Sequence, residues 1–348
     1  MNLFRGDSIR GNLRMLAALI LVILCSSTRA QISMRANVTV AKDGSGHFTT
    51  ISAAIEAAPK MSATKFYVAI RAGVYTENVF IGQDKQNIVL IGDGMDTTII
   101  SGNRSNATGF RTYETATVGI RGLGFVAQDI TFENTAGPSR NQAVALRIEA
   151  DHSAFYKCRF KGYQDTLYTL KKTQFFRECE IYGTVDFIFG NSAVVFQNCV
   201  IYVLKPRDSQ KNTITAQKRE FRDEKTGIII QNCTIAAAPN LRRQFLNFKT
   251  FLGRPWGVFS RTVIINSFLD SLIDPAGWLE WEGRGPDELD KVFYAEYKNK
   301  GPGANIKGRV PWARIINSST EAAEFTVRNF INGDRWIPST IPFFPDLM

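Results

Sequence analysis

Histidine is nearly absent from this chain of 348 residues, which contains only His47 and His152. Neither histidine accompanies a G-x-S-x-G elbow, and "DGSGH" at residues 43–47 does not match that pattern, which argues against a serine esterase. No C-x-x-C pair occurs either, so the histidines and cysteines form no recognisable zinc motif. We therefore expect neither a metal ion nor a cofactor.

Long hydrophobic runs are also missing. The uncharged apolar run from Met15 to Cys25 is about half as long as the ~20 residues that a membrane-spanning helix needs. Arg5, Arg10 and Arg14 precede it, and "TRA" at 28–30 follows it. This arrangement predicts a signal peptide over residues 1–30, a secreted protein and no membrane anchor. Because no linker or low-complexity run follows, we predict one domain over residues 31–348.

Acidic residues are fewer than basic ones, and the formal net charge is +10. Removing residues 1–30, which contain four arginines and one aspartate, would change it to +7. A secreted basic protein suits a polyanionic partner. Outside the cell this partner is more often an acidic polysaccharide than a nucleic acid, so we expect no nucleic-acid binding.

One sequence motif, here called a word, occurs twice in the chain. "CRFKGYQDTLY" from Cys158 aligns without gaps with "CEIYGTVDFIF" from Cys179, and "CVIY" from Cys199 opens a third copy. Short apolar segments recur at 129–135, 228–235 and 262–270. A period of about 20 to 30 residues, rich in β-branched residues, Asn and Gly, is typical of a β-solenoid, in which stacked coils bury an inner face together. We predict an all-β fold built as a parallel β-helix.

Four cysteines remain after residue 30: Cys158, Cys179, Cys199 and Cys233. Residues one coil apart lie at the strand spacing of ~4.8 Å, which is within the ~4.4–6.8 Å Cα range of a disulfide. The 21-residue spacing predicts a Cys158–Cys179 disulfide and leaves Cys199 to pair with Cys233. Cys179 with Cys199, 20 residues apart, is the competing pair.

Asp165 and Asp186 are also 21 residues apart, so the same stacking would place their carboxylates side by side. Two carboxylates ~5 Å apart cannot both ionise freely, so one pKa rises and the pair can divide the roles of acid and nucleophile. A ladder of stacked polar side chains without chemistry would have the same spacing. The spacing alone leaves both interpretations open.

The two ends of the solenoid need covers. Residues 49–59, "TTISAAIEAAP", have a threonine cap, an apolar face and a proline stop, which predicts a short N-terminal helix that caps the first coil. Residues 334–348 are rich in proline and aromatic residues. We expect them to form a tail that lies back over the coils.

Several words in this order resemble the plant pectin methylesterases. They are "GVYTENV" at 73–79, "QAVALR" at 142–147, "GYQDTLY" at 162–168, "GTVDFIFGN" at 183–191, "LGRPW" at 252–256 and "PAGWLEW" at 275–281. The resemblance covers nearly all of the chain after residue 30. It implies a right-handed parallel β-helix that hydrolyses methyl esters of polygalacturonate (pectin) in the plant cell wall, releases methanol and uses no metal.

The resemblance also implies roles for individual residues. Asp186 would be the nucleophile and Asp165 the proton donor and then the base, while Arg254 would orient Asp186. Gln142 and Gln164 would donate hydrogen bonds to the oxyanion. The substrate cleft would be lined by Tyr168, Phe189, Arg254, Trp256 and Trp278.

The chain departs from the family pattern in places. Lys218 follows "TITAQ", where the family commonly has glycine, and Gly257 and Val258 follow "GRPW", where it usually has a charged pair. These changes put the substrate pattern in doubt, not the reaction. Because the β-helix motifs begin soon after residue 30, we also expect a form without the N-terminal inhibitor-like pro-region that many relatives carry. We therefore expect that a separate inhibitor protein could regulate the enzyme. We expect the protein itself to be a monomer.

Four N-x-S/T sequons are candidate glycosylation sites: Asn37, Asn103, Asn106 and Asn317. Two other functions remain open. One is a glycoside hydrolase of the polygalacturonase type, because two carboxylates ~5 Å apart also suit a retaining mechanism. The other is a catalytically inactive pectin-binding protein.

Overall fold

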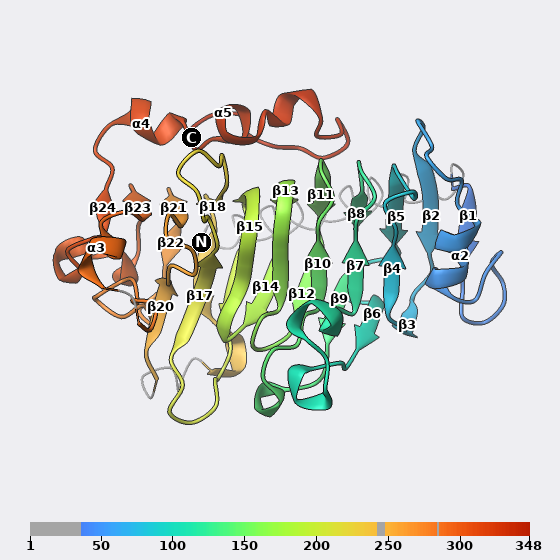
Figure 1. The fold of residues 1–348 in the computed structure, drawn as a ribbon. Helices are drawn as coiled ribbons and strands as arrows, with labels where there is room; N and C mark the ends of the chain where they lie inside the picture. Colours follow the sequence, from blue (N-terminus) through green and yellow to red (C-terminus); the bar gives the residue numbers. More distant parts are fainter. Residues whose placement is uncertain (1–35, 242–247, 284) are drawn as a thin grey trace, which may run out of the picture.

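The protein is a right-handed parallel β-helix. The computed structural model describes residues 36–241, 248–283 and 285–348. Every pairing between its strands is parallel, and successive coils stack along one axis, which runs horizontally in Figure 1. The predicted fold class is therefore confirmed. The predicted signal peptide, residues 1–30, lies outside the described residues.

The coils have three faces. The first face contains β4 (Val79–Ile81), β7 (Val118–Ile120), β10 (Leu146–Ile148), the first half of β13 (Leu167–Arg177), the first half of β15 (Val185–Gln197), β17 (Asn212–Gln217) and β20 (Thr250–Gly253). The second contains β1 (Val38–Val40), β2 (Phe66–Ile70), β5 (Ile88–Gly92), β8 (Val126–Gln128), β11 (Ser153–Tyr156), the second halves of β13 and β15, β18 (Gly227–Gln231), β21 (Arg261–Ile265), β23 (Phe293–Tyr297) and β24 (Arg314–Ile315). The third contains β3 (Gly73–Thr76), β6 (Thr98–Gly102), β9 (Thr131–Asn134), β12 (Arg159–Lys161), β14 (Glu180–Gly183), β16 (Val200–Val203), β19 (Thr234–Ala237) and β22 (Phe268–Leu269).

Two long strands join the first and second faces. In β13 and β15 the register shifts between Tyr168 and Lys171, where the strands turn the corner without ending. The shared glycine of the repeated words allows the turn that precedes each strand. A Cβ on Gly162 would lie 2.7 Å from Thr166 Oγ1, and one on Gly183 would lie 2.2 Å from the Cβ of Phe187. Only glycine fits such an approach, which explains why both copies of the motif have glycine at this position.

Stacked side chains fill the interior. The rings of Phe155, Phe176 and Phe196 follow one another with centroids 4.6 Å apart, and all three are fully buried. Such offset stacks add to the free energy gained by burying the rings. The repeat seen in the sequence is therefore a repeat of core positions.

The four cysteines form a column in the core. The register aligns Arg159 with Glu180, so the preceding residues, Cys158 and Cys179, lie in adjacent coils as predicted. However, all four cysteines are free thiols, and the predicted disulfides are wrong. Aligned residues of parallel strands point the same way, so their Cβ atoms stay about a strand spacing of ~4.8 Å apart. A disulfide needs a Cβ separation of ~3.5–4.5 Å.

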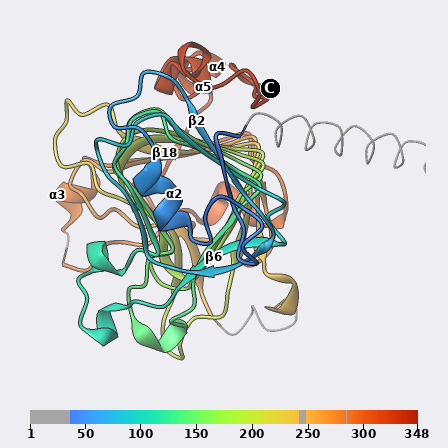
Figure 2. The same ribbon diagram turned by 90° about the vertical axis from the view of Figure 1, so that its right-hand side faces the viewer.

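The N-terminal helix covers the open end of the first coil, as Figure 2 shows in the view along the axis. The helix is α2 (Ile51–Ala57), and the side chain of Thr50 caps it by accepting a hydrogen bond from Ala53 N. Ile51, Ala54 and Ile55 are buried. The capping helix predicted over residues 49–59 is confirmed.

The C-terminal segment lies across the second face, along the top of Figure 1. It contains α4 (Ser319–Ala323) and α5 (Val327–Ile331), and it follows the short α3 (Pro286–Leu289). Gln197 Nε2 donates to the carbonyl of Phe344, and Gln231 Nε2 donates to that of Asp346. The tail predicted to lie back over the coils is confirmed. Within the described ranges, no helix has the length and apolar character needed to cross a membrane.

Candidate active site

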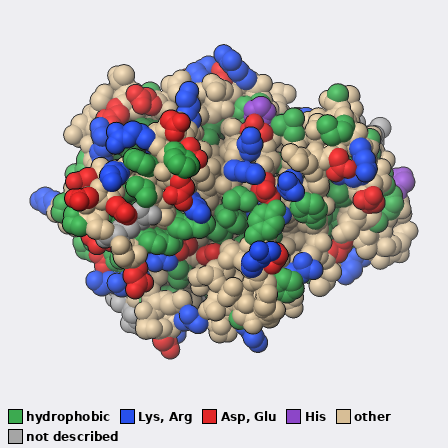
Figure 3. Space-filling view, in the orientation of Figure 1, with side chains coloured by type: hydrophobic (Ala, Val, Ile, Leu, Met, Phe, Trp, Pro, Cys, Tyr) green, Lys and Arg blue, Asp and Glu red, His purple; other side chains and the backbone are tan. Residues whose placement is uncertain are grey.

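A cavity of ≈ 560 Å³ opens on the first face, where β13 and β15 begin. Asp165 and Asp186 both line it, and the register that pairs Leu167 with Ile188 also aligns the two aspartates. Figure 3 shows hydrophobic side chains across the middle of the surface that Figure 1 presents, with Lys and Arg side chains around them. The structure therefore brings together the two residues that the repeat singled out.

Both aspartates adopt a left-handed backbone conformation, with φ of 64° for Asp165 and 51° for Asp186. Outside glycine this conformation is uncommon, although Asp and Asn adopt it more readily than most residues. Residues at a different corner, such as Asn198 after β15 and Asn232 after β18, have the same conformation. The corner thus directs both carboxylates into the cavity.

The carboxylate of Asp186 accepts three hydrogen bonds. Arg254 donates from Nε to Oδ1 over 2.8 Å and from Nη2 to Oδ2 over 2.6 Å. Thr213 Oγ1 donates to Oδ1 over 2.6 Å and also accepts from the backbone N of Asp186 over 2.9 Å. A bidentate arginine fixes the plane of a carboxylate and favours its ionised form. Asp186 has the contacts that a positioned carboxylate nucleophile needs.

Asp165 is in a different environment. Burial raises its pKa well above the ordinary value, the nearby charge of Asp186 raises it further, and Arg254 only partly offsets these effects. The residue is 7% exposed, and its backbone N donates to the carbonyl of Val185, whereas its carboxyl group has no hydrogen-bond partner among the described residues. A carboxyl group that keeps its proton beside one that is ionised can act as a general acid.

Gln142 and Gln164 both line the cavity. Their carbonyl groups accept backbone hydrogen bonds from Asn106 and Ala143, which fixes the main chain at each position. Within the described residues neither side-chain amide has a protein partner, so both are available to donate into the cavity. Amide donors of this kind suit an oxyanion.

Aromatic side chains form the floor and one wall of the cavity. Tyr168 and Phe189 are stacked with ring centroids 4.1 Å apart, and Trp256 lies 6.1 Å from Phe189. Trp281 stacks on Trp256 at 6.3 Å. Rings in such a row offer apolar faces to a sugar. Burial, followed by the charge of Asp165, raises the pKa of Tyr168 to about 12, so its hydroxyl stays protonated.

Trp278 does not line the cavity, and the expectation that it does is wrong. It is 1% exposed and packs edge-on against Tyr294, with centroids 4.8 Å apart. It is aligned with Gly253 by an isolated parallel bridge, and it belongs to the core of the last coils. Trp281, three residues later in the same word, takes the expected place and lies 4.4 Å below the Arg254 guanidinium.

Three further residues face the cavity or support it: Tyr113 and Lys218 come from segments between strands, and Thr213 comes from β17. Tyr113 belongs to a 3₁₀ helix, Thr112–Thr115, and lines the cavity. Lys218 Nζ lies 4.4 Å from the centroid of the Trp256 ring. Thr213 supports Asp186 from the next coil. The departure from the family pattern at residue 218 was a signal for Lys218, and Thr213 opens the motif "TITAQ" that precedes it, whereas no quoted motif contains Tyr113.

The two tryptophans of "GWLEW" should respond differently to alanine substitution. We expect Trp278→Ala to lower the free energy of unfolding by ~3–5 kcal/mol, because it empties a buried site. Trp281→Ala should change stability little but raise KM about 2- to 10-fold, as expected for losing a stacking contact of ~0.5–1.5 kcal/mol. Denaturant unfolding and steady-state kinetics check both; equal effects of the two variants would contradict the assignment.

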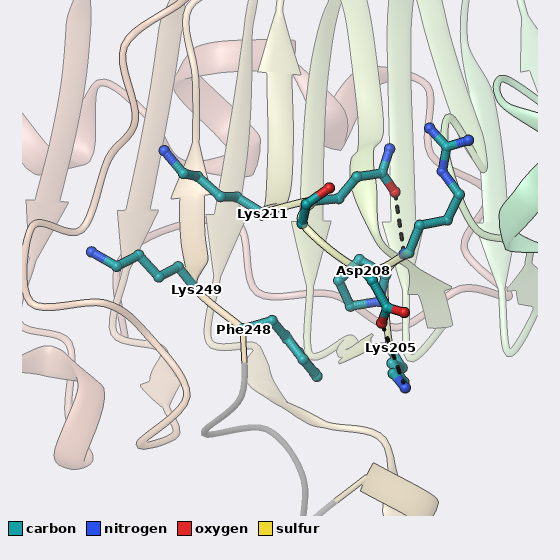
Figure 4. A pocket seen from close by; sticks show the side chains of 9 residues that line it. Lys205, Asp208, Lys211, Phe248 and Lys249 are labelled. Atoms are coloured by element: carbon teal, nitrogen blue, oxygen red, sulfur yellow. Dashed lines mark hydrogen bonds and ion pairs between the residues drawn. The ribbon is translucent and has the colours of Figure 1, made fainter.

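A second cavity, of ≈ 480 Å³, lies beside the segment 204–211. In Figure 4 the side chains of Lys211 and Lys249 extend to one side, while Lys205 points away from them and pairs with Asp208 at 4.0 Å. Asp208 is fully exposed, so this cavity does not contain a buried carboxylate pair. Within the described ranges no group of three His, Cys, Asp or Glu side chains could hold a metal ion.

The comparison with protein-family models shows to which family the chain belongs. The family model described as Pectinesterase matches residues 37–334. The chain belongs to the pectinesterase family. Among curated relatives it is 54% identical over 310 residues to "Probable pectinesterase/pectinesterase inhibitor 39" of Arabidopsis thaliana, covering 88% of this chain and 58% of the relative. It is 50% identical to "Pectinesterase 2" of Citrus sinensis, covering 90% and 61%. The chain thus spans about three fifths of the length of these pectinesterases.

Solved pectinesterase structures are similar over almost their whole length. The pectin methylesterase from carrot is 48% identical, with a TM-score of 0.88 and coverage of 90% of this chain and 98% of that one. The pectin methylesterase from Aspergillus niger is 29% identical, with a TM-score of 0.75 and coverage of 87% and 96%. These matches establish the fold and the family together.

Proposed function

We propose that the protein is a pectinesterase that hydrolyses methyl esters of polygalacturonate and releases methanol. One observation carries the proposal: Asp186, held by Arg254 and Thr213, shares a cavity with Asp165, whose pKa is raised. The pair combines a positioned carboxylate with a protonated acid. A related pectin methylesterase of known structure, 25% identical, was solved in complex with a hexasaccharide, which supports a saccharide ligand for this fold.

In the first half of the reaction Asp186 attacks the ester carbonyl carbon. The carbonyl oxygen becomes an oxyanion, which Gln142 and Gln164 stabilise by donating hydrogen bonds. Asp165 transfers its proton to the departing methoxide, so that methanol leaves and an acyl-enzyme anhydride forms between Asp186 and the galacturonate.

In the second half Asp165 is a carboxylate and acts as a base. It takes a proton from water, which attacks the acyl carbon and releases the free galacturonate. Asp186 returns to its ionised form beside Arg254, and Asp165 is protonated again. The aromatic row from Tyr168 to Trp281 holds the polymer across the carboxylates.

One assay tests the proposal against the alternatives. With highly methylated pectin we expect methanol without new reducing ends, and no effect of a chelator. Reducing ends without methanol would indicate a polygalacturonase-like glycoside hydrolase. Binding without any product would indicate an inactive pectin-binding protein. Either result would overturn the proposed reaction.

Gln142→Ala should lower kcat by roughly 10² to 10³, the usual cost of removing one oxyanion donor. Because the amide stabilises charge that develops only in the transition state, KM should change much less than kcat. Steady-state methanol release measures both constants. A rise in KM at unchanged kcat would show instead that Gln142 only binds the substrate.

The setting of the protein is also proposed. We propose a signal peptide over residues 1–30, secretion to the plant cell wall, action as a single-domain monomer and control by a separate proteinaceous inhibitor. This setting agrees with the family and with the basic charge. The asparagines of the four candidate sequons, Asn37, Asn103, Asn106 and Asn317, are all exposed, so the fold leaves them accessible to glycosylation.

A further inference from the structure

Two cavities share the segment that joins β16 on the third face to β17 on the first. One is the cavity of ≈ 480 Å³ shown in Figure 4, and the other, of ≈ 440 Å³, adjoins it, because residues 205–208 line both. Among the described residues, neither cavity shares a lining residue with the catalytic cavity. Tyr163 lines the ≈ 440 Å³ cavity and Gln164 lines the catalytic one, so this corner of the chain separates them.

The joining segment has a defined conformation. Asn212 Nδ2 donates to the carbonyl of Leu204 over 3.2 Å, which closes the base of the segment. Near its tip the backbone N of Arg207 donates to Oε1 of Gln210 over 3.2 Å, and the backbone N of Gln210 donates to the carbonyl of Arg207 over 3.1 Å. The backbone N of Asn212 also donates to the carbonyl of Lys249 over 2.8 Å, which ties the segment to the next coil.

The charged side chains that line the cavity of Figure 4 are Lys205, Arg207, Asp208, Lys211 and Lys249. Asp208 lies 4.0 Å from Lys205, and Lys249 pairs with Asp274 at 3.4 Å. Arg207 and Lys211 form no ion pair with any other described residue, and both are exposed. Two positive charges at this cavity therefore have no counter-ion from the protein.

Lys211 and Lys249 occupy equivalent positions in adjacent coils. Each directly precedes a strand residue, and these two residues, Asn212 and Thr250, are aligned by the register. Aligned residues of neighbouring strands lie ~4.8 Å apart. In Figure 4 both lysine side chains extend to the same side. Like charges held this close repel each other, and a bound anion would relieve the repulsion.

Apolar surface accompanies the positive charge. Phe248, which is partly buried against the core, lines the cavity of Figure 4. Pro138 and Tyr163 line the adjoining cavity, and Pro206 lines both. Flat apolar rings beside cations match a polyuronate, because its sugar rings have apolar faces and its carboxylates are anionic. A small inorganic anion would use the cations alone.

We propose that residues 204–211, together with Phe248 and Lys249, form a second polysaccharide site that binds a de-esterified stretch of polygalacturonate. Arg207 and Lys211 pair with its carboxylates, and a sugar ring packs on Phe248. The proposed reaction turns a neutral ester into a carboxylate, so this site attracts the product more strongly than the substrate. It therefore holds the enzyme on regions of the polymer that are already de-esterified. The inference rests on the proposed function, since that reaction supplies the ligand.

The test is titration calorimetry of the full chain with a de-esterified oligogalacturonate of about ten units at low salt. The double variant Arg207→Gln, Lys211→Gln should raise Kd about 5- to 10-fold, as expected for losing two exposed charge pairs. The difference should shrink at about 0.5 M salt, because exposed charges are then screened. A fully methylated oligomer should bind the variant and the wild type equally. Lys307→Gln with Arg335→Gln removes two exposed cations elsewhere and should change Kd less than 2-fold.

A second pair of titrations separates this site from the catalytic cavity. In a Trp281→Ala background, which weakens the cavity, Arg207→Gln with Lys211→Gln should raise Kd by the same factor as in the wild type. If that loss disappears, the two cations act through the catalytic cavity and the inference fails. Polyglutamate, a polyanion without sugar rings, should lose less affinity than the oligogalacturonate; an equal loss would overturn the assignment to a polysaccharide.

The remaining outcomes separate this inference from the proposed function. If the wild type releases methanol but the double variant binds the de-esterified oligomer as tightly as the wild type, the second site does not exist and the proposed function stands. If the control pair weakens binding equally, only net charge matters and the inference fails. If the wild type releases no methanol while Arg207 and Lys211 still govern binding, the proposed function fails and the site stands. Thermal unfolding confirms that each variant is folded.

Discussion

Asp186→Asn should reduce methanol release by roughly 10⁴-fold or more, because the amide keeps the size of the side chain but cannot attack an ester carbonyl. Arg254 and Thr213, which now hold the carboxylate, would still contact the amide oxygen, so folding should persist. Methanol release under saturating pectin measures the loss, and pectin co-sedimentation measures the binding that remains.

Asp287→Asn is the matched control, because Asp287 is exposed on α3, away from the cavity lining. It should keep wild-type activity. Full methanol release by Asp186→Asn would remove the proposed mechanism, since Asp165 alone cannot be both the nucleophile and the proton donor. A variant that neither turns over nor binds pectin would point to a lost fold, which circular dichroism would reveal.

Asp165→Asn should lower kcat/KM by about 10² to 10⁴, the usual value of general acid–base catalysis. Because burial and the charge of Asp186 raise the pKa of Asp165, its proton is present below that pKa and is lost as pH rises through it. The wild-type kcat/KM should therefore fall on the alkaline side of the optimum. The variant, which has no proton to lose, should not show this limb.

The ionisation of Asp165 should also make the free energy of unfolding fall as pH rises. The folded-state pKa of Asp165 lies above the unfolded value, so its favourable contribution is complete below the unfolded pKa and is lost as pH rises through the folded one. Asp165→Asn should thus be at least as stable as the wild type at neutral pH, and more stable at higher pH. Thermal unfolding across pH tests this; a variant that is less stable at high pH would contradict the assigned shift.

The 21-residue repeat predicts the fold and the aspartate pair for a physical reason. A period in the sequence fixes the register between coils, and the register fixes which residues are neighbours. Asp165 and Asp186 need only be neighbours to influence each other. The same register is insufficient for Cys158 and Cys179, because a disulfide also needs side chains that converge, and aligned parallel strands keep them side by side.

Trp278 and Trp281 show a second limit of prediction from the sequence, which concerns the direction of a side chain. Both belong to one matched word, and neither spacing nor composition tells which ring enters the core. The direction of each side chain is set by the pairing of Trp278 with Gly253, a contact between segments that no repeat connects.

Tyr113 and Lys218 were outside the reach of periodicity for a related reason. Both lie in segments that join coils and have no counterpart one period away. Where a solenoid departs from its repeat, the sequence no longer says which residues share a surface. In this protein, such segments supply Tyr113 and Lys218 to the lining of the cavity that contains Asp165 and Asp186.

β15 has a mechanical consequence for the molecule. This single strand begins at the corner that holds Asp186 and ends at Gln197, whose side-chain amide both donates to the carbonyl of Phe344 and accepts from its N–H. Asp186, the proposed nucleophile, and Gln197, which anchors the tail, thus lie near the two ends of one continuous strand that turns a corner of the coil. Amide protons along β15 should exchange as one cooperative unit. Loosening the tail should first expose the amides at the Gln197 end, which is far from the substrate.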